Sequence, residues 1–278
     1  FITYTLDYYL DGNISSVSTS STSILRYAYD GMGRLKTEES NGKYKDTYTY
    51  DAFGNRSQKV HEDLANSTSA ATSYTYDLNN RLLKTVETAG DMQSITDISY
   101  DPNGNQLMKL DSVIAPMTTE DVEELLLSEG LGGVDTYEYD AFNRLTKSVV
   151  DGTAATYTYD ANNLRQSKTS GGVTTNHVYD GQNIVLDVTG TTKQAYIRGV
   201  RLISKVSGST KEYYHTNWHG DVTVLSIASG TFTKEYGYDA FGNPLAENEN
   251  DTNPFRYCGE YFDQETGNVY LRNRYYDT

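Results

Sequence analysis

Apolar and polar residues alternate along most of the chain, which is the pattern of a β-strand. Tyrosines stand two positions apart, with one polar residue between them, in YTYD (48–51 and 74–77), YEYD (137–140) and YTYD (157–160). Side chains two apart in a strand point to the same face, so Tyr48 and Tyr50 are expected to share a face while Thr49 points to the other. Alternation of this kind predicts half-buried strands.

Each of these segments ends in Tyr-Asp and is followed by a turn signal. The turns read AFGN at 52–55 and 240–243, GMGR at 31–34 and PNGN at 102–105. An aspartate suits the first turn position because its carboxylate accepts backbone N–H groups just ahead of it. Glycine or asparagine then supplies the positive φ that closes the loop. Because a second alternating segment follows, as in RLKTEE (34–39), one unit is predicted to be a β-hairpin with a return turn.

The Tyr-Asp unit recurs through the chain, which predicts an array of stacked hairpins. The first seven copies are spaced 20 to 26 residues apart, with one gap of 39. A decayed copy is expected at Leu10–Asn13, and two divergent units are expected around Tyr196 and Tyr214. The repeat signature comprises Tyr29, Asp30, Tyr50, Asp51, Tyr76, Asp77, Tyr100, Asp101, Tyr139, Asp140, Tyr159, Asp160, Tyr179, Asp180, Tyr238 and Asp239.

Residues 111–135 interrupt the repeat with the sequence TTEDVEELLLSEGLGG. Thr118 or Thr119 is a suitable N-cap, and the acidic residues after it favour the N-terminal end of a helix. Val122, Leu125 and Leu126 share one helical face, and a glycine stops the pattern. We therefore predict a short helix at about 119–129 that packs on the sheet or plugs an opening, with partner binding as the alternative.

Composition narrows the class of protein. The 38 acidic residues exceed the 23 Lys and Arg and give a formal charge of -15, which argues against nucleic-acid binding, since phosphate contacts need a basic surplus. No apolar run approaches the roughly 20 residues of a membrane span. A single cysteine excludes an intramolecular disulfide framework. The chain opens without a signal-peptide pattern, and both ends are expected to continue into a longer sequence.

The positions of the histidines and the cysteine in the sequence do not predict a metal site or a reactive thiol. His215 and His219 have a spacing that holds a metal on a helix, with Asp221 close by. Their segment has the pattern of strand and turn, where residues four apart lie roughly 13 Å from each other, so no metal site is predicted. His177 takes the place of a repeat tyrosine and is expected to substitute for it. Cys258 is expected to be a buried structural thiol.

The sequence also lacks the common catalytic motifs. The chain contains no Gly-x-Ser-x-Gly elbow, P-loop or dinucleotide motif, so no catalytic residue and no cofactor are predicted. Asp101 and Pro102 are interpreted as turn residues. The arginines that follow the turns are expected to pair with turn aspartates or to cover tyrosine rings; they are Arg34, Arg56, Arg81 and Arg144.

These units resemble the YD repeat of the Rhs (rearrangement hotspot) family over nearly the whole chain outside the interruption. The stretch NPFRYCGEYFDQETGNVYLRNRYYDT (253–278) is similar to the segment that closes the Rhs repeat-associated core, and YYHTNWHGDVTVL (213–225) to the unit before it. The predicted organisation is repeats at 1–110, an insertion at 111–135, repeats at 136–250 and a closing segment at 251–278. The closing motif comprises Pro254, Phe255, Arg256, Tyr257, Gly259, Gly267, Tyr270, Arg272, Arg274, Tyr275, Tyr276 and Asp277.

The resemblance implies an all-β fold in which tandem hairpins form a curving or spiral sheet, a partial shell with one short inserted helix. In bacterial members such a shell holds a variable C-terminal toxin, which many of them release by self-cleavage at a DPxG-type motif downstream of RYYD. No such motif follows RYYD in this sequence, and the one Asp-Pro pair, Asp101-Pro102, lies in a turn in the middle of the repeats. The resemblance therefore implies a non-catalytic shell fragment of a bacterial protein that is secreted, displayed on the cell surface or injected. Its implied partners are the rest of the shell and an enclosed toxin.

Two alternatives stay open at this stage. A tyrosine-rich sheet stacks well on sugar rings, so a module that binds carbohydrate or cell wall is the first. The second is a part of a self-cleaving toxin precursor whose protease motif lies downstream of this chain. Exposed edge strands also make self-association an expected property of such a fragment.

Overall fold

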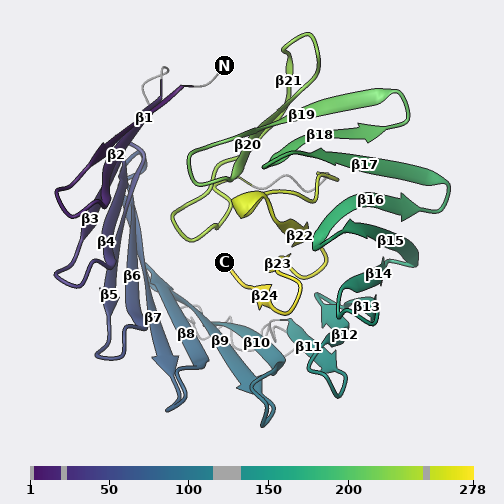
Figure 1. Cartoon of the computed structure of the whole chain (residues 1–278). Coiled ribbons are helices and arrows are strands. Elements are labelled where there is room, and N and C mark those ends of the chain that lie inside the picture. The colour runs from purple at the N-terminus through teal and green to yellow at the C-terminus, as the bar shows by residue number, and fades with distance from the viewer. Residues whose placement is uncertain (1–2, 20–23, 115–132, 247–250) are drawn as a thin grey trace, which may run out of the picture. The chain divides into compact units, whose positions relative to one another are not determined.

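The computed structural model describes residues 3–19, 24–114, 133–246 and 251–278, which belong to two compact units, residues 1–135 and 136–278 (Figure 1). Among the described residues the chain is all-β apart from one 3-10 turn, η1 (Tyr257–Gly259), which confirms the all-β part of the predicted fold class. The helix predicted at about 119–129 falls outside the described residues. None of the helical segments described has the length and apolar content to cross a membrane.

In the first unit each strand pairs antiparallel with the next along the chain, from β1 to β10. Successive strands turn relative to one another, so the sheet curves (Figure 1). The strands are β1 (Tyr4–Tyr8), β2 (Ile14–Thr19), β3 (Ile24–Tyr29), β4 (Leu35–Ser40), β5 (Tyr44–Tyr50), β6 (Arg56–Asp63), β7 (Thr68–Tyr76), β8 (Leu82–Ala89), β9 (Met92–Tyr100) and β10 (Gln106–Ile114).

The second unit repeats this pattern from β11 to β21 and adds a small sheet of three strands. The repeat strands are β11 (Val134–Tyr139), β12 (Leu145–Val150), β13 (Thr153–Tyr159), β14 (Arg165–Ser170), β15 (Val173–Asp180), β16 (Asn183–Thr189), β17 (Thr192–Arg198), β18 (Leu202–Ser207), β19 (Thr210–Thr216), β20 (Val222–Ser226) and β21 (Phe232–Glu235). The small sheet consists of β22 (Tyr261–Asp263), β23 (Asn268–Tyr270) and β24 (Tyr275–Tyr276).

The turn aspartates close the hairpins through their carboxylates. At Asp51, Oδ1 accepts the amides of Phe53 and Asn55, both at 2.9 Å, while Gly54 takes a φ of 92°. The left-handed backbone there suits glycine, which has no Cβ to clash. A bond from the amide four residues ahead recurs at Asp30, Asp77, Asp101, Asp140, Asp160 and Asp239. These bonds are the ones expected from the turn chemistry.

Two turns depart from the expected pattern. Asp180 pairs directly with Asn183 across a two-residue loop. The turn expected at Leu10–Asn13 begins one residue earlier, because the Tyr9 amide donates to the Asn13 carbonyl at 2.8 Å and Tyr9 takes the place of the aspartate. The divergent units expected around Tyr196 and Tyr214 are present as the hairpins β17–β18 and β19–β20.

In five of the Tyr-Asp pairs, the tyrosine hydroxyl joins its hairpin to the preceding one. A β-bulge falls between Thr49 and Tyr50, and the Tyr50 hydroxyl donates to the Leu35 carbonyl at 2.7 Å. Equivalent hydroxyl bonds to the preceding hairpin are made by Tyr76, Tyr100, Tyr159 and Tyr179. Since the accepting carbonyl begins the second strand of the neighbouring hairpin, each of these five tyrosines helps to set the spacing between two units.

The arginines after the turns also contact two neighbouring hairpins, as expected. Arg34 donates from Nε to Asp30 at 2.7 Å, and its guanidinium lies 4.6 Å from the centre of the Tyr50 ring. Arg81 and Arg144 make the same two kinds of contact. Arg56 lies over a ring as well, 4.5 Å from the centre of Tyr74. The signature residues therefore act as scaffold for the array.

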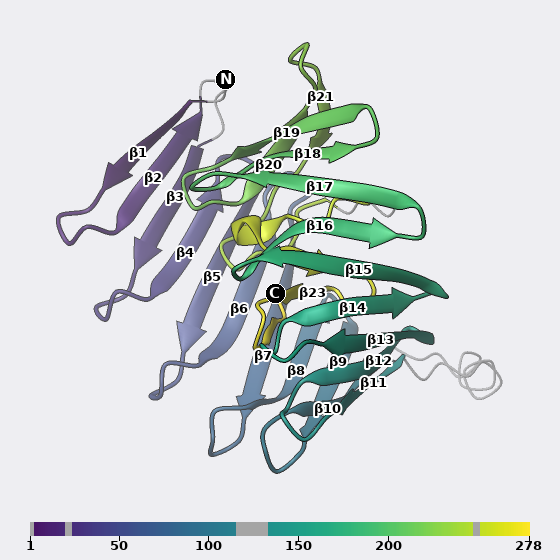
Figure 2. The ribbon, with the colours of Figure 1, turned by 45° about the vertical axis from the view of Figure 1, so that its right-hand side comes forward.

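In the second unit, residues 251–278 lie on one face of the curved sheet (Figure 1, Figure 2). We call these residues the closing segment. Its buried aromatic side chains complete a core with residues of β16 to β20, a core that contains Ile184, Tyr196, Leu202, Tyr214, Val222, Leu225, Phe255, Tyr261 and Tyr270. The hairpins supply one wall of this core and the closing segment supplies the other.

Candidate functional site: the docked closing segment

Aromatic packing seats the closing segment on the sheet. Phe255 is 2% exposed, and its ring meets Tyr196 edge to face with 4.7 Å between the ring centres. Tyr261 packs on Phe255 in the same manner at 5.4 Å. Edge-to-face contacts of this kind add to the stabilisation from area burial alone. Arg198 of β17 covers Phe255, with the guanidinium carbon 4.7 Å from the ring centre.

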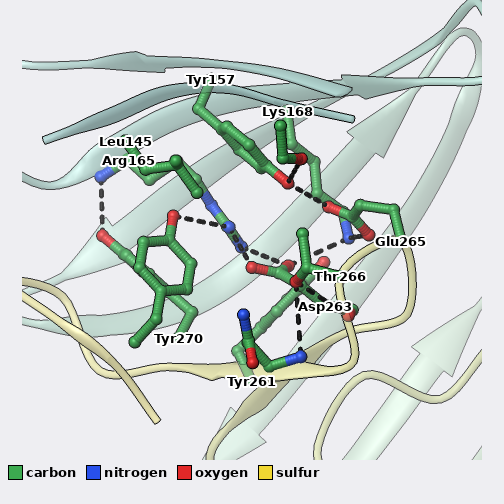
Figure 3. A network of polar contacts seen from close by, with 12 residues as sticks. Leu145, Tyr157, Arg165, Lys168, Tyr261, Asp263, Glu265, Thr266 and Tyr270 are labelled. Carbon is green, nitrogen blue, oxygen red and sulfur yellow. Dashed lines mark hydrogen bonds and ion pairs between the residues drawn. The ribbon is translucent and has the colours of Figure 1, made fainter. Parts of the chain in front are cut away.

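An ion pair closed to solvent joins the sheet to the segment. Arg165 of β14 and Asp263 of β22 are both 0% exposed, and Nη2 of the arginine lies 2.8 Å from the carboxylate (Figure 3). Burial by itself would raise the pKa of Asp263, but the charges of Arg165 and Lys168 hold it below its ordinary value. Both charges are therefore retained in the interior, where each depends on the other.

Lys168 and Glu265 extend this ion pair into a network. The Lys168 ammonium lies 3.1 Å from Asp263 and 2.9 Å from Glu265 (Figure 3). The Tyr157 hydroxyl donates to Glu265 at 3.2 Å, and burial raises the pKa of that hydroxyl far above its ordinary value. The network thus joins β13 and β14 to the loop that follows β22.

Arg165 occupies a position that three other hairpins give to leucine and one gives to arginine, Arg56. It is the fifth residue after the turn aspartate, the place taken by Leu35, Leu82 and Leu145. Its backbone amide donates to the Tyr270 hydroxyl at 2.9 Å, and its guanidinium carbon lies 4.1 Å from the centre of the Tyr270 ring. Where the closing segment docks, the sheet therefore carries a cation at the position that the preceding hairpin gives to Leu145.

A second carboxylate on the sheet collects three partners. Asp187 of β16 lies 2.7 Å from His177 Nδ1, and it accepts the hydroxyls of Tyr196 at 2.8 Å and Tyr261 at 3.0 Å. Burial lowers the pKa of His177, although the bond to Asp187 opposes that shift. His177 stands in the tyrosine row, and its ring meets Tyr261 at 5.3 Å between ring centres.

Asp251 and Asn253 anchor the start of the closing segment. Asp251 is paired with Lys234 and accepts the Tyr236 hydroxyl at 2.5 Å. Burial would raise the pKa of Asp251, but these partners hold it below its ordinary value. Asn253 accepts the Tyr214 hydroxyl at 2.7 Å. Strands β19 and β21 are thereby tied to the segment.

Two stacked tyrosines cover the Asp239 turn. Tyr257 and Tyr276 lie 6.2 Å apart between ring centres at an interplanar angle of 17°. Their hydroxyls donate to the carbonyls of Ala240 at 3.2 Å and Phe241 at 2.7 Å. Gly242 is required here, because its φ is 95° and a Cβ would lie 2.6 Å from the Tyr257 ring.

A further contact joins the β19–β20 turn to the η1 turn. Asp221 Oδ1 lies 2.9 Å from His219 Nδ1 and accepts the Cys258 amide at 2.8 Å, and Cys258 Sγ lies 3.8 Å from the same ring nitrogen. The bond to Asp221 is the main reason that the pKa of His219 is raised to about 10. His215 does not join this group, since its Nε2 contacts Ser226 on β20.

The expectation that Cys258 is buried is wrong. Cys258 is exposed and lies in the tight η1 turn, where its φ is 53°. The sequence also showed no base near this cysteine, because His219 and Asp221 lie more than 35 residues before it and only the docking brings them together.

The other predicted motif residues mostly shape the closing segment itself. Arg256 lies over the Phe262 ring at 4.3 Å, and Gly267 takes a φ of 71° in the β22–β23 turn. Arg272 pairs with Glu260 and reaches the Gln182 carbonyl at 3.1 Å. Pro254, Gly259, Arg274, Tyr275 and Asp277 complete the motif; Pro254 accepts the Phe262 amide, and Tyr275 meets Tyr159 hydroxyl to hydroxyl at 3.2 Å.

Sequence reasoning missed the residues of the sheet that receive the segment. Arg165 and Lys168 lie on β14 and Asp187 lies on β16, and none of the three was singled out. A signal existed only for Arg165, which is charged where the preceding hairpin carries Leu145, but Arg56 is charged at the same repeat position and so weakens that signal. Lys168 and Asp187 stand at positions that look like an ordinary polar face.

A cavity of about 460 Å³ lies between the sheet and the closing segment. Its lining combines polar groups with aromatic rings and includes Asp187, Thr189, Gln194, Tyr196, Asp251 and Phe262. The carboxylates in this wall already hold protein partners. The arrangement is suited to holding a segment in place, and the chemistry it offers is charge pairing and hydrogen bonding.

The chain is similar in sequence to known bacterial proteins, as the following comparisons show. No protein-family model matches the chain. The chain is 32% identical over 256 residues to the tRNA3(Ser)-specific nuclease WapA of Bacillus spizizenii, and 31% identical over 256 residues to the tRNA nuclease WapA of Bacillus subtilis. Each alignment covers 90% of this chain and 10% of the relative, so the chain spans a small part of either protein.

A solved structure shares the fold. The crystal structure of TcdB2-TccC3-TEV aligns with 99% of this chain and 16% of its own chain, with a TM-score of 0.61 at 15% sequence identity. At that identity the likeness concerns the fold, a long antiparallel array of hairpins.

Proposed function

The chain belongs to the Rhs, or YD-repeat, family, and we propose its function on that premise. It is a non-catalytic part of a repeat shell, and in the longer protein this shell encloses a C-terminal toxin domain. The WapA relatives are named as tRNA nucleases, so a nuclease is the class of enclosed domain that we propose. Its partners would be the remaining repeats of the shell and that domain. The location would be outside the producing cell, on its surface or in a target.

The buried pair of Arg165 and Asp263 is the observation that carries this proposal. A wall that has to enclose another domain needs a stable end, and the closing segment is held on the sheet by charges that cannot separate without leaving one of them unpaired in the interior. The segment also covers the aromatic row of the sheet, which would otherwise face outward as an apolar surface.

The stitched hairpins support the same function. Five hairpins are bonded to the preceding one through a tyrosine hydroxyl, and at several turns an arginine makes a further bond between hairpins. These contacts repeat with the sequence, so the wall can be lengthened by adding hairpins of the same kind.

Limited proteolysis of the longer protein tests the enclosure. The domain downstream of Thr278 is expected to resist protease in the intact protein and to be cut rapidly when it is expressed alone. A variant with Asp263→Asn is expected to expose that domain sooner. Equal cleavage of the domain inside the protein and in isolation would show that the repeats do not enclose it.

Carbohydrate binding is a second candidate, supported by the cavity beneath the closing segment. Its volume of about 460 Å³ is that of a small-ligand site, and hydroxyl, amide and carboxylate groups lie beside Tyr196 and Phe262. A glycan array and a pull-down with peptidoglycan test this candidate. Retention that is lost in Gln194→Ala would support it, and no retention on either would end it.

A further inference from the structure

We propose that His219, Asp221 and Cys258 form a binding site for a borderline-soft divalent cation of the Zn²⁺ type. Among the described residues, one group of three metal-ligating side chains has all its ligand atoms within 4.8 Å of one another, and it is this one. The proposal goes beyond the shell function, which needs no metal.

The three donors are the types that zinc prefers. Thiolate sulfur, imidazole nitrogen and carboxylate oxygen bind Zn²⁺ at about 2.0–2.3 Å. His219 Nδ1 lies 2.9 Å from Asp221 Oδ1 and 3.8 Å from Cys258 Sγ, so a cation would replace the proton that the first two atoms share. A thiolate ligand also favours Zn²⁺ over Mg²⁺ or Ca²⁺, which prefer oxygen.

The backbone holds the ligands in place from two sides. Asp221 accepts the Cys258 amide at 2.8 Å, and the Val222 amide donates to the Arg256 carbonyl at 3.0 Å. Gly259 lies so close to the Gly220 carbonyl that a Cβ would be 3.3 Å from it. These contacts fix the turn that carries the histidine and the aspartate against the turn that carries the cysteine.

The site has one buried ligand and two that face solvent. Asp221 is 5% exposed, whereas the His219 side chain is 49% exposed and Cys258 is exposed. A cation can therefore enter without opening the core, and water can fill the remaining coordination position. Asn217 also donates to the second Asp221 oxygen at 2.7 Å, which orients the carboxylate as outer partners of metal ligands do.

Other histidine–carboxylate pairs in the described chain lack a thiol. His61 lies 2.6 Å from Asp46, and His177 lies 2.7 Å from Asp187, but neither pair belongs to a group of three ligands. They provide internal controls for the contribution of the cysteine. Because Cys258 belongs to the closing segment, a bound cation would join that segment to the β19–β20 turn.

Titration of the reduced chain with Co²⁺, followed by Zn²⁺ competition, tests the site. The wild type is expected to show a thiolate-to-cobalt charge-transfer band in the near ultraviolet, which Zn²⁺ abolishes, and Zn²⁺ is expected to raise its melting temperature. Both effects should disappear in Cys258→Ser and His219→Gln. They should persist in the matched controls His215→Gln and His61→Gln.

Thermal unfolding without metal shows whether each variant is folded, and Cys258→Ser alters an exposed side chain. Cobalt absorption without a thiolate band in the wild type would overturn the proposal. The same would follow if Cys258→Ser kept the Zn²⁺-induced rise in melting temperature.

Discussion

Arg165 and Asp263 lie 98 residues apart in sequence and form a buried ion pair, with the guanidinium on the sheet and the carboxylate on the closing segment. The pair lies where the repeating hairpins contact the closing segment, which does not follow the repeat. Each charge is shielded from water, so its solvation depends on its partner being present. Docking of the segment and retention of the two charges are therefore coupled.

Asp263→Asn is expected to lower the free energy of unfolding of the second unit by about 3–5 kcal/mol, because Arg165 then stays buried without a carboxylate. Urea unfolding followed by the fluorescence of Trp218 measures the change. Glu138→Gln is the matched control, since Glu138 pairs with Lys147 at an exposed position and should cost less than about 1 kcal/mol. Similar effects of the two substitutions would contradict the coupling.

Gly242→Ala and Gly54→Ala compare two copies of the hexapeptide YDAFGN. Both glycines have a positive φ, 95° and 92°, so each alanine is expected to cost about 1–2 kcal/mol of backbone strain. At Gly242 the new Cβ also meets the Tyr257 ring, which is expected to add about 1–3 kcal/mol. Differential scanning calorimetry of both variants measures the difference. A Gly54→Ala protein as unstable as Gly242→Ala would show that the tyrosine cover has no effect.

Tyr76→Phe is expected to destabilise the first unit by about 1 kcal/mol, because it removes the hydroxyl bond to the Arg56 carbonyl and leaves the ring in place. Amide hydrogen exchange across β6 to β8 should rise locally. Tyr8→Phe is the control, because Tyr8 takes the same place in the first hairpin but is 59% exposed. Unchanged exchange in Tyr76→Phe would mean that the hydroxyl does not join the hairpins.

Because the turn aspartates have lowered pKa values, we expect the protein to lose folding stability in acid. Backbone bonds from Arg81, more than any other favourable contact, lower the pKa of Asp77 below its ordinary 3.8, and hydrogen bonds lower those of Asp30 and Asp51 as well. A carboxylate with a depressed native pKa stabilises the fold above its unfolded pKa, and the contribution is lost as pH falls through the native value.

Melting temperature against pH measures this effect. Stability of the first unit should fall as pH drops below about 4, and Asp77→Asn should be less stable at neutral pH but lose less between pH 5 and pH 2. An identical pH dependence in wild type and Asp77→Asn would show that the carboxylate makes no such contribution.

Much of the hairpin array could be predicted because its causes are local. Tyr48 and Tyr50 share a face because side chains alternate along any strand, and Asp51 closes its turn with amides two and four residues ahead. The arginine contacts could be predicted from the sequence as well, since Arg34 contacts only its own turn and the next hairpin. The first turn was predicted one residue too late, because Tyr9 stands in the place of the aspartate while the backbone bonds of the turn remain.

The sequence alone determined that this protein is a chain of hairpins, because period-two alternation and turn chemistry act within a few residues. Only the tertiary structure decided which face of the sheet receives the closing segment, and hence that Arg165 meets Asp263 and that Cys258 meets His219. Such pairs join residues tens of positions apart. Their partners are chosen by how the segment packs on the curved sheet, and no local pattern in either partner specifies that packing.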